Sequence, residues 1–228
     1  MKRAYAGIAT ILLPAFLFFA AVSHGQSSPE REIILSWQAL NFFPANYKGK
    51  PLATPFSPVR IGAELIENGR FVDISQYSIV WKLDNKLLKS GVGLKETSFR
   101  VQKTAGDFHI IQVVMEKDGI KIDSSMLIPV SSQTIVVDIP HPGNTIKSNT
   151  ENPVQAVPYF FNIRSLRDIS FYWQVNDRKE GGGSNNTLLL KTGTPQTNDQ
   201  KVIEITASAQ NNENPLEFAK SKVWLNVR

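Results

Sequence analysis

The sequence predicts an all-β protein made of two β-sandwich domains in tandem, behind an N-terminal signal segment. Two runs carry this prediction, 77–84 (YSIVWKLD) and 169–176 (ISFYWQVN), because apolar residues recur at every second position in both. A period of two is typical of a strand with one buried face. Their tryptophans, Trp81 and Trp173, lie 92 residues apart, which is about the length of one small sandwich domain.

The N-terminal segment, residues 1–25, has the features of a secretory signal. Lys2 and Arg3 precede an uncharged apolar run at 8–22, and small residues at 21–23 (AVS) offer a cleavage site. The run is short for a bilayer core of about 30 Å, which favours cleavage over a permanent anchor. We therefore expect an exported protein, periplasmic, cell-surface or extracellular, that touches a membrane only if the signal stays uncleaved.

Composition narrows the class of protein further. Basic and acidic residues are mixed along the chain, and the net charge falls from +5 to +3 once Lys2 and Arg3 are removed, so a nucleic-acid partner is not expected. Cysteine is absent. An exported protein without cysteine has no disulfides, so core burial alone must hold its domains together.

The first domain is predicted over residues 31–130 and the second over 133–228, joined by a short linker at 129–132. Alternating apolar residues separated by turn residues predict each strand. In the first domain the strands are 33–39, 59–65, 77–84, 86–89, 97–101, 108–116 and 120–130, with an Asp-Gly hairpin turn before the last. In the second they are 134–139, 157–163, 169–176, 188–190, 203–209 and 219–227, with loops at 140–153 and 180–184.

The two central tryptophans are predicted to form the structural core. A tryptophan on a central strand buries roughly 200 Å², or on the order of 5 kcal/mol of apolar transfer free energy. A small domain has a net stability of only about 5–15 kcal/mol. Trp81 and Trp173 are therefore each expected to be essential to their own domain.

Parts of the sequence resemble known domains. The run 105–114 (AGDFHIIQVV) with 117–119 (KDG) resembles the penultimate strand and hairpin of PKD-like and other bacterial immunoglobulin-like domains, and the Trp81 strand resembles their third strand. The run 43–50 (FPANYKGK) is similar to a segment of uncharacterised secreted bacterial proteins with tandem domains of this kind. The resemblance implies two immunoglobulin-like sandwiches and an envelope or extracellular location.

No catalytic, cofactor or metal site is expected from the residues. The histidines, His24, His109 and His141, are not spaced to bind a metal ion, and no Gly-x-Ser-x-Gly turn is present. Acidic residues fall beside turns or at outward strand positions, which indicates a solvated surface. One alternative is calcium bound near the domain junction. Its side chains would come from Asp84, Asn85, Asn176, Asp177 and Asp138.

The segment 40–58 is the most unusual stretch, because it combines four prolines with several aromatic residues and lacks periodicity. It is either an exposed apolar patch that binds a partner or a plug for the end of its own sandwich. A further candidate lies on the outward face of the last strand. The candidate partner-binding residues are Phe42, Phe43, Tyr47, Phe56 and Trp224.

These observations favour an exported, non-enzymatic structural or adhesive module of the bacterial cell envelope that binds an envelope or extracellular protein. The alternative is a carbohydrate-binding module in which Tyr47 or Trp224 stacks on a glycan. A third hypothesis, from another class, is a secreted hydrolase whose carboxylates pair only in the folded state.

Overall fold

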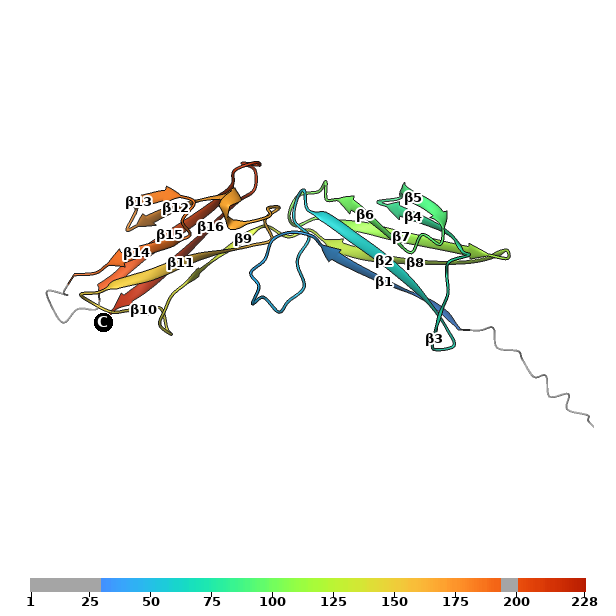
Figure 1. The fold of residues 1–228 in the computed structure, drawn as a ribbon, viewed down its shortest axis with the longest axis horizontal. Coiled ribbons are helices and arrows are strands. Elements are labelled where there is room, and N and C mark those ends of the chain that lie inside the picture. The colour runs from blue at the N-terminus through green and yellow to red at the C-terminus, as the bar shows by residue number, and fades with distance from the viewer. Residues whose placement is uncertain (1–29, 194–200) are drawn as a thin grey trace, which may run out of the picture.

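The structure, a computed structural model, describes residues 30–193 and 201–228. The predicted signal segment lies outside them. Strands dominate the described residues and build two β-sandwiches that follow one another along the chain (Figure 1). The prediction of an all-β protein with two immunoglobulin-like sandwiches in tandem is confirmed.

The first sandwich has two sheets. In one, β2 pairs with β1, β3 and β6, and the other has the order β5-β4-β7-β8. Asp84 and Asn85 both have positive φ at the β4–β5 turn, and Asp118-Gly119 makes the β7–β8 hairpin. The strands are β1 (Arg31–Ala39), β2 (Pro58–Glu67), β3 (Arg70–Val72), β4 (Ser78–Leu83), β5 (Lys86–Val92), β6 (Glu96–Arg100), β7 (Phe108–Lys117) and β8 (Ile120–Pro129).

The second sandwich also has two sheets, with the orders β14-β11-β9 and β10-β16-β15-β12-β13. A short 3₁₀ helix, η1 (Leu166–Asp168), precedes β12. The strands are β9 (Thr134–Asp138), β10 (Thr145–Ile146), β11 (Glu151–Tyr159), β12 (Ile169–Val175), β13 (Arg178–Gly183), β14 (Thr187–Lys191), β15 (Lys201–Asn211) and β16 (Phe218–Val227).

The two halves repeat one topology. The pairing of β1, β2 and β6 recurs in β9, β11 and β14, and the order β5-β4-β7-β8 recurs in β13-β12-β15-β16. Trp81 lies opposite Val113 in the first half, and Trp173 lies opposite Ala207 in the second. These pairs fix which positions of the two halves are equivalent, so the repeat extends from the tryptophan strands to their neighbours.

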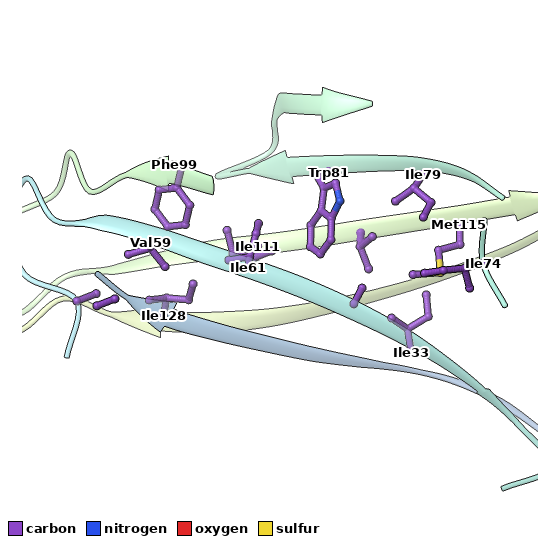
Figure 2. Close-up of a cluster of buried hydrophobic side chains, with 14 of the residues drawn as sticks. Ile33, Val59, Ile61, Ile74, Ile79, Trp81, Phe99, Ile111, Met115 and Ile128 are labelled. Carbon is purple, nitrogen blue, oxygen red and sulfur yellow. The ribbon is translucent and has the colours of Figure 1, made fainter. Parts of the chain in front are cut away.

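Each half has its own core. Figure 2 shows Trp81 reaching from β4 into the space between the sheets, near Ile61 and Ile111. Trp81 is fully buried, and its Nε1 donates a hydrogen bond to the carbonyl of Leu94 at 2.9 Å. Trp173 is buried among apolar residues of the second half, but its Nε1 has no hydrogen-bond partner within the described residues.

The strand β11 differs from the prediction of 157–163, because it begins and ends earlier and includes Pro153 and Pro158. β14 pairs with residues 151–155 and β9 with residues 155–159. Each proline therefore has a partner strand on one side only, where a missing N–H is tolerated. The sequence also assigned most of β13 to a loop, and it did not predict β3, β10 or η1.

Candidate binding surfaces

The segment between β1 and β2 joins the two sandwiches through the backbone. The amide of Phe42 donates to the carbonyl of Phe161 at 2.8 Å, and the amide of Phe160 donates to the carbonyl of Phe42 at 2.6 Å. A residue of the first half thus pairs as if it were part of a strand of the second. In Figure 1 the segment hangs as a blue loop between the two sandwiches.

Two buried side chains reinforce this contact. Thr54 Oγ1 donates to the carbonyl of Phe160 at 2.9 Å, and Asn41 Nδ2 approaches the same oxygen at 3.3 Å. Phe160 has a φ of 65°, in the left-handed region. Such a conformation costs about 1–2 kcal/mol for a residue other than glycine, which the hydrogen bonds to its carbonyl offset.

A buried carboxylate completes the contact from the second half. Asn162 Nδ2 donates both to the carbonyl of Pro55, at 2.9 Å, and to Glu217. Glu217 is buried and also accepts from the backbone amide of Asn162 and from Asn211 Nδ2. The expectation that every acidic residue lies at the surface is wrong for Glu217, because amide donors replace the water that a buried carboxylate loses.

Aromatic rings pack around the backbone bridge. The ring centroid of Tyr47 lies 5.6 Å from those of Tyr159 and Phe160 and 5.8 Å from that of Phe43. The Nζ atom of Lys50, from the same segment, lies 3.5 Å from the ring centroid of Trp37 in the first half. Burial lowers the pKa of the Lys50 amine. The segment therefore contacts both sandwiches.

The sequence-predicted candidates separate into two groups. Phe42, Phe43 and Tyr47 are half-buried in the contact between the sandwiches, so they neither form an open patch nor plug their own sandwich alone. Phe56 and Trp224 are exposed, with 40% and 56% of their surface accessible. The structure does not bring Trp224 together with the aromatic segment, because Trp224 lies on the outward face of β16.

A second apolar surface was not predicted. The outward side of the sheet β5-β4-β7-β8 carries Phe108 and Leu127, which are 48% and 58% exposed. Leu127 lies opposite Ile110, and Val80 lies opposite Val114. We call this set of five residues the apolar face. The signal was present in the run 108–115 (FHIIQVVM), where apolar residues occupy both alternating sets of positions.

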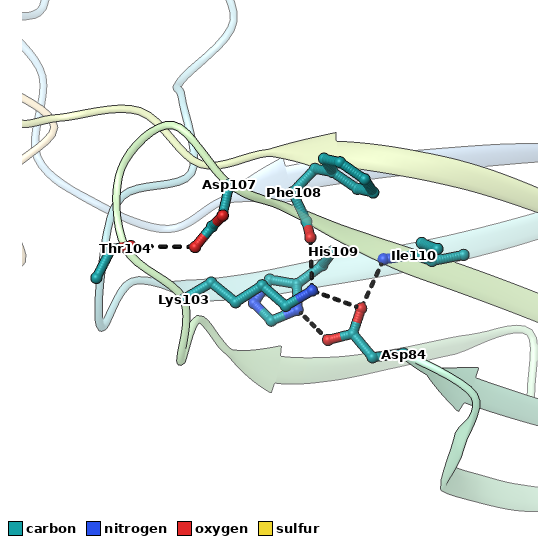
Figure 3. Close-up of polar contacts among 7 residues, drawn as sticks. All are labelled: Asp84, Lys103, Thr104, Asp107, Phe108, His109 and Ile110. Carbon is teal, nitrogen blue, oxygen red and sulfur yellow. Dashed lines mark hydrogen bonds and ion pairs between the residues drawn. The ribbon is translucent and has the colours of Figure 1, made fainter.

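Beside the apolar face, a buried histidine of β7, His109, is bonded to Asp84 of the β4–β5 turn (Figure 3). His109 is only 2% exposed, and its Nδ1 lies 2.7 Å from Asp84 Oδ2. Asp84 Oδ1 accepts from the backbone amide of Ile110 at 2.9 Å and from Lys103 Nζ at 3.1 Å. Burial raises the pKa of Asp84, but the bonds from Ile110, His109 and Lys103 outweigh it and leave the pKa below its usual value.

Two of the five side chains considered for calcium, Asp84 and Asn176, have a structural role that the two halves share. Asp84 accepts from the amide of Ile110, and its own amide donates to the carbonyl of Ile110. Asn176 makes the same reciprocal pair with Glu204. Nowhere in residues 30–193 or 201–228 do three or more His, Asp or Glu side chains form a group that could hold a metal ion. No helix among these residues is long and apolar enough to cross a membrane.

The strand order, the registers and the separate cores decide the architecture. The chain is a pair of immunoglobulin-like sandwiches. No known family model matches the sequence, and no curated protein matches it either.

Among solved structures, the pair is similar to the fibronectin(III)-like modules of Clostridium thermocellum CbhA, with 12% identity over 85% of this chain and 93% of that one, and a TM-score of 0.28. It is also similar to three N-terminal domains of the bacteriophage RB49 outer capsid protein Hoc, with 13% identity, 87% and 70% coverage and a TM-score of 0.32. A third is Bacteroides ovatus SGBP-B in complex with a mixed-linkage heptasaccharide, with 11% identity, 89% and 48% coverage and a TM-score of 0.26.

Proposed function

We propose that the protein is an exported, non-enzymatic binding module of the bacterial cell envelope that docks on a protein partner through its first sandwich. The proposed organisation is a signal at residues 1–25 and domains at 31–130 and 133–228. The observation that carries the proposal is the apolar face, with Phe108 and Leu127 both about half exposed. Large apolar side chains grouped on a sheet face are typical of a surface that another protein covers.

The surroundings of the apolar face support a protein as the occupant. Lys82 and Gln112 form a polar row between the Val80–Val114 pair and the Ile110–Leu127 pair, and Asp123 lies opposite Val114. Protein–protein interfaces combine apolar contacts with about one hydrogen bond per 100–200 Å², so this polar row can pair with groups of the partner. Covering the exposed halves of a leucine and a phenylalanine side chain contributes about 1 kcal/mol each.

The contact between the sandwiches adds rigidity to the module. Domains in one chain move relative to each other unless their interface is extensive. In this protein the bridge between Phe42 and Phe161, together with the bonds of Thr54 and Asn162, links the two halves beyond the short connection at 129–132. A preordered pair of domains loses less conformational entropy when it binds, which favours an adhesive or structural role.

Export is proposed from the sequence. Lys2 and Arg3, the apolar run at 8–22 and the absence of cysteine are together typical of a bacterial secreted protein that folds without disulfides. Mass spectrometry of the mature N-terminus tests this part. Export predicts a chain that begins close to residue 26, and a chain that retains Met1 in the cytoplasm contradicts it.

Site-resolved crosslinking tests the proposed docking surface. A photo-crosslinking amino acid at Leu127 is compared with one at Glu32, an exposed residue of the other sheet, in cells that produce the full chain. We expect a discrete protein adduct from position 127 only, and its loss when Phe108→Asp places a charge in the apolar face. Equal adducts from both positions, or an adduct that survives Phe108→Asp in a folded variant, would contradict the proposal.

A further inference from the structure

The two halves present different chemistry at equivalent positions of the same sheet. The register of Trp81 with Val113 and of Trp173 with Ala207 defines the equivalence. In the first half the outward positions on β4, β7 and β8 are occupied by Val80, Val114, Asp123, Ser125 and Leu127. In the second half the same positions on β12, β15 and β16 are occupied by Tyr172, Ser208, Lys220, Lys222 and Trp224.

We call these second-half residues the aromatic–lysine face. Tyr172 and Trp224 are 47% and 56% exposed. Tyr172 pairs through Ser208 with Lys220, and Trp224 lies four residues further along β16, so the Cα atoms of the two aromatic residues are about 16 Å apart. A strip of hydroxyl, amide and ammonium groups therefore separates two aromatic rings, and the carboxylate of Glu204 lies opposite Trp224.

The position of the Tyr172 ring depends on a glycine. A Cβ added to Gly182 would lie 3.0 Å from Cδ1 of Tyr172 and 3.2 Å from the carbonyl of Phe171. Gly182 pairs with Tyr172 on the edge strand β13. The absence of a side chain there lets the ring lie close against the backbone of β13, while 47% of the surface of Tyr172 stays exposed.

The charge of this face is positive. Lys179, Lys220 and Lys222 are exposed at its outward positions, and Glu204 pairs with Lys222 at 2.7 Å. The hydrogen bond that Lys222 donates to Glu204 is the largest cause that raises the pKa of Lys222, and the charge of Asp177 raises it further. Among the described residues, no acidic side chain lies within ion-pair distance of Lys179 or Lys220, so the face attracts an anion.

We propose that the aromatic–lysine face binds an acidic polysaccharide, a chain of pyranose sugars that carries carboxylates. The aromatic rings of Tyr172 and Trp224 stack on the apolar C–H faces of two sugars. Between them, Ser208 and Gln174 hydrogen-bond sugar hydroxyls, and Lys220 pairs with a carboxylate. The site lies on the second sandwich and does not depend on the proposed protein partner of the first.

Aromatic rings in place of aliphatic side chains on the two sides of the polar row distinguish this face from that of the first half. The equivalent strip of the first half is aliphatic at Val80 and Val114, where the second half has Tyr172 and Ser208. Polar groups between stacking rings match a ligand that is apolar on its ring faces and polar at its ring edges. The lysines then select a sugar with a carboxylate over a neutral one.

Titration of the full chain with an oligogalacturonate, followed by calorimetry, tests the proposal. A neutral cello-oligosaccharide of the same length is the comparison ligand. We expect measurable binding of the oligogalacturonate alone, weakened by added salt because the pairing is ionic. Tyr172→Ala and Trp224→Ala are each expected to weaken it by about tenfold, the scale of an anchoring aromatic residue. Lys220→Gln is expected to weaken it and reduce its salt dependence.

Leu189→Ala is the matched control, because Leu189 is exposed on the opposite sheet of the same sandwich. It is expected to leave binding unchanged. Because Tyr172, Trp224 and Lys220 are exposed, their variants should keep the native circular dichroism spectrum. The proposal is overturned by no binding of the oligogalacturonate, by equal binding of the neutral ligand, or by full affinity in both aromatic variants. Each of these results leaves the proposed protein docking of the first sandwich untouched.

Discussion

Replacing Asp84 should destabilise the first sandwich by an amount that depends on the substitution and on pH. Asp84→Ala removes the acceptor of the Ile110 amide and of His109 Nδ1, both in a partly buried site. Leaving such groups without a partner costs about 1–3 kcal/mol each, and alanine is also strained at the φ of 49°. We expect a total loss of about 3 kcal/mol in the free energy of unfolding of the first half.

Asp84→Asn is the sharper variant, because the second half already uses Asn176 at the equivalent turn to accept from the amide of Glu204. It keeps the bond to Ile110 and removes only the charge that faces His109 and Lys103. We therefore expect a loss of about 1 kcal/mol at pH 7, the contribution of hydrogen bonds between charged groups that are partly exposed.

The pH dependence has a defined sign. The pKa of Asp84 is lower in the folded state than the value of about 3.9 in an unfolded chain, so the carboxylate stabilises the fold above that value. This stabilisation is lost as the pH falls through the lower, folded-state pKa. The difference in stability between the native protein and Asp84→Asn should thus shrink as the pH falls below about 4.

Urea unfolding at each pH, with hydrogen exchange followed by mass spectrometry, reports the two halves separately. The second half, with Asn176, is the internal reference and should respond little to either substitution. The reasoning about Asp84 would be refuted if Asn cost as much as Ala at pH 7. It would be refuted equally if the difference between the native protein and Asp84→Asn stayed constant down to pH 3.

Three further predictions test the cores and the contact between the halves. Trp81→Ala and Trp173→Ala should each lower the free energy of unfolding by about 3–5 kcal/mol and unfold their own half, which hydrogen exchange would report. Near-native stability of either variant contradicts the core assignment. Combining Asn41→Leu with Thr54→Val removes two hydrogen-bond donors at the contact between the halves. We expect faster proteolysis within residues 40–58 and a wider range of interdomain distances by X-ray scattering. An unchanged cleavage rate contradicts the role of these bonds. Glu217→Gln replaces an acceptor with a donor that faces the amides around it, so the second half should lose about 1–3 kcal/mol, whereas an unchanged unfolding midpoint contradicts the buried network.

Periodicity predicted the strands whose two faces differ. In β16 the sequence alone separated inward Leu225 and Val227 from outward Lys222 and Trp224, and the burial pattern has the same alternation. β11 was harder, because Pro153 and Pro158 argue against a central strand. Only the offset of β9 and β14 along β11 explains why both prolines are tolerated. That offset depends on pairing between distant segments, which no local pattern contains.

For the candidate surfaces too, local patterns identified the segments, but their positions depend on contacts between distant parts of the chain. The aromatic segment 40–58 was found from composition, but its destination was not, because Asn41 and Phe160 meet across 119 residues of sequence. Glu217 was assigned to the surface for a similar reason. Its burial depends on Asn162 and Asn211, whose amides reach it from other parts of the second half. A carboxylate and its donors are recognisable as a group only once the chain is folded.

Comparison of the two halves separates what the fold requires from what it leaves free. The inward rows hold a tryptophan against a small or branched apolar residue, Val113 in one half and Ala207 in the other, and all of these side chains are buried. The outward rows differ in size, polarity and charge, with Leu127 where the second half has Trp224. Because alternate residues of a strand face opposite sides, outward positions change at little cost to the core. One scaffold can therefore present an aliphatic face and a cationic aromatic face, while the contact between the halves holds both in a defined relation.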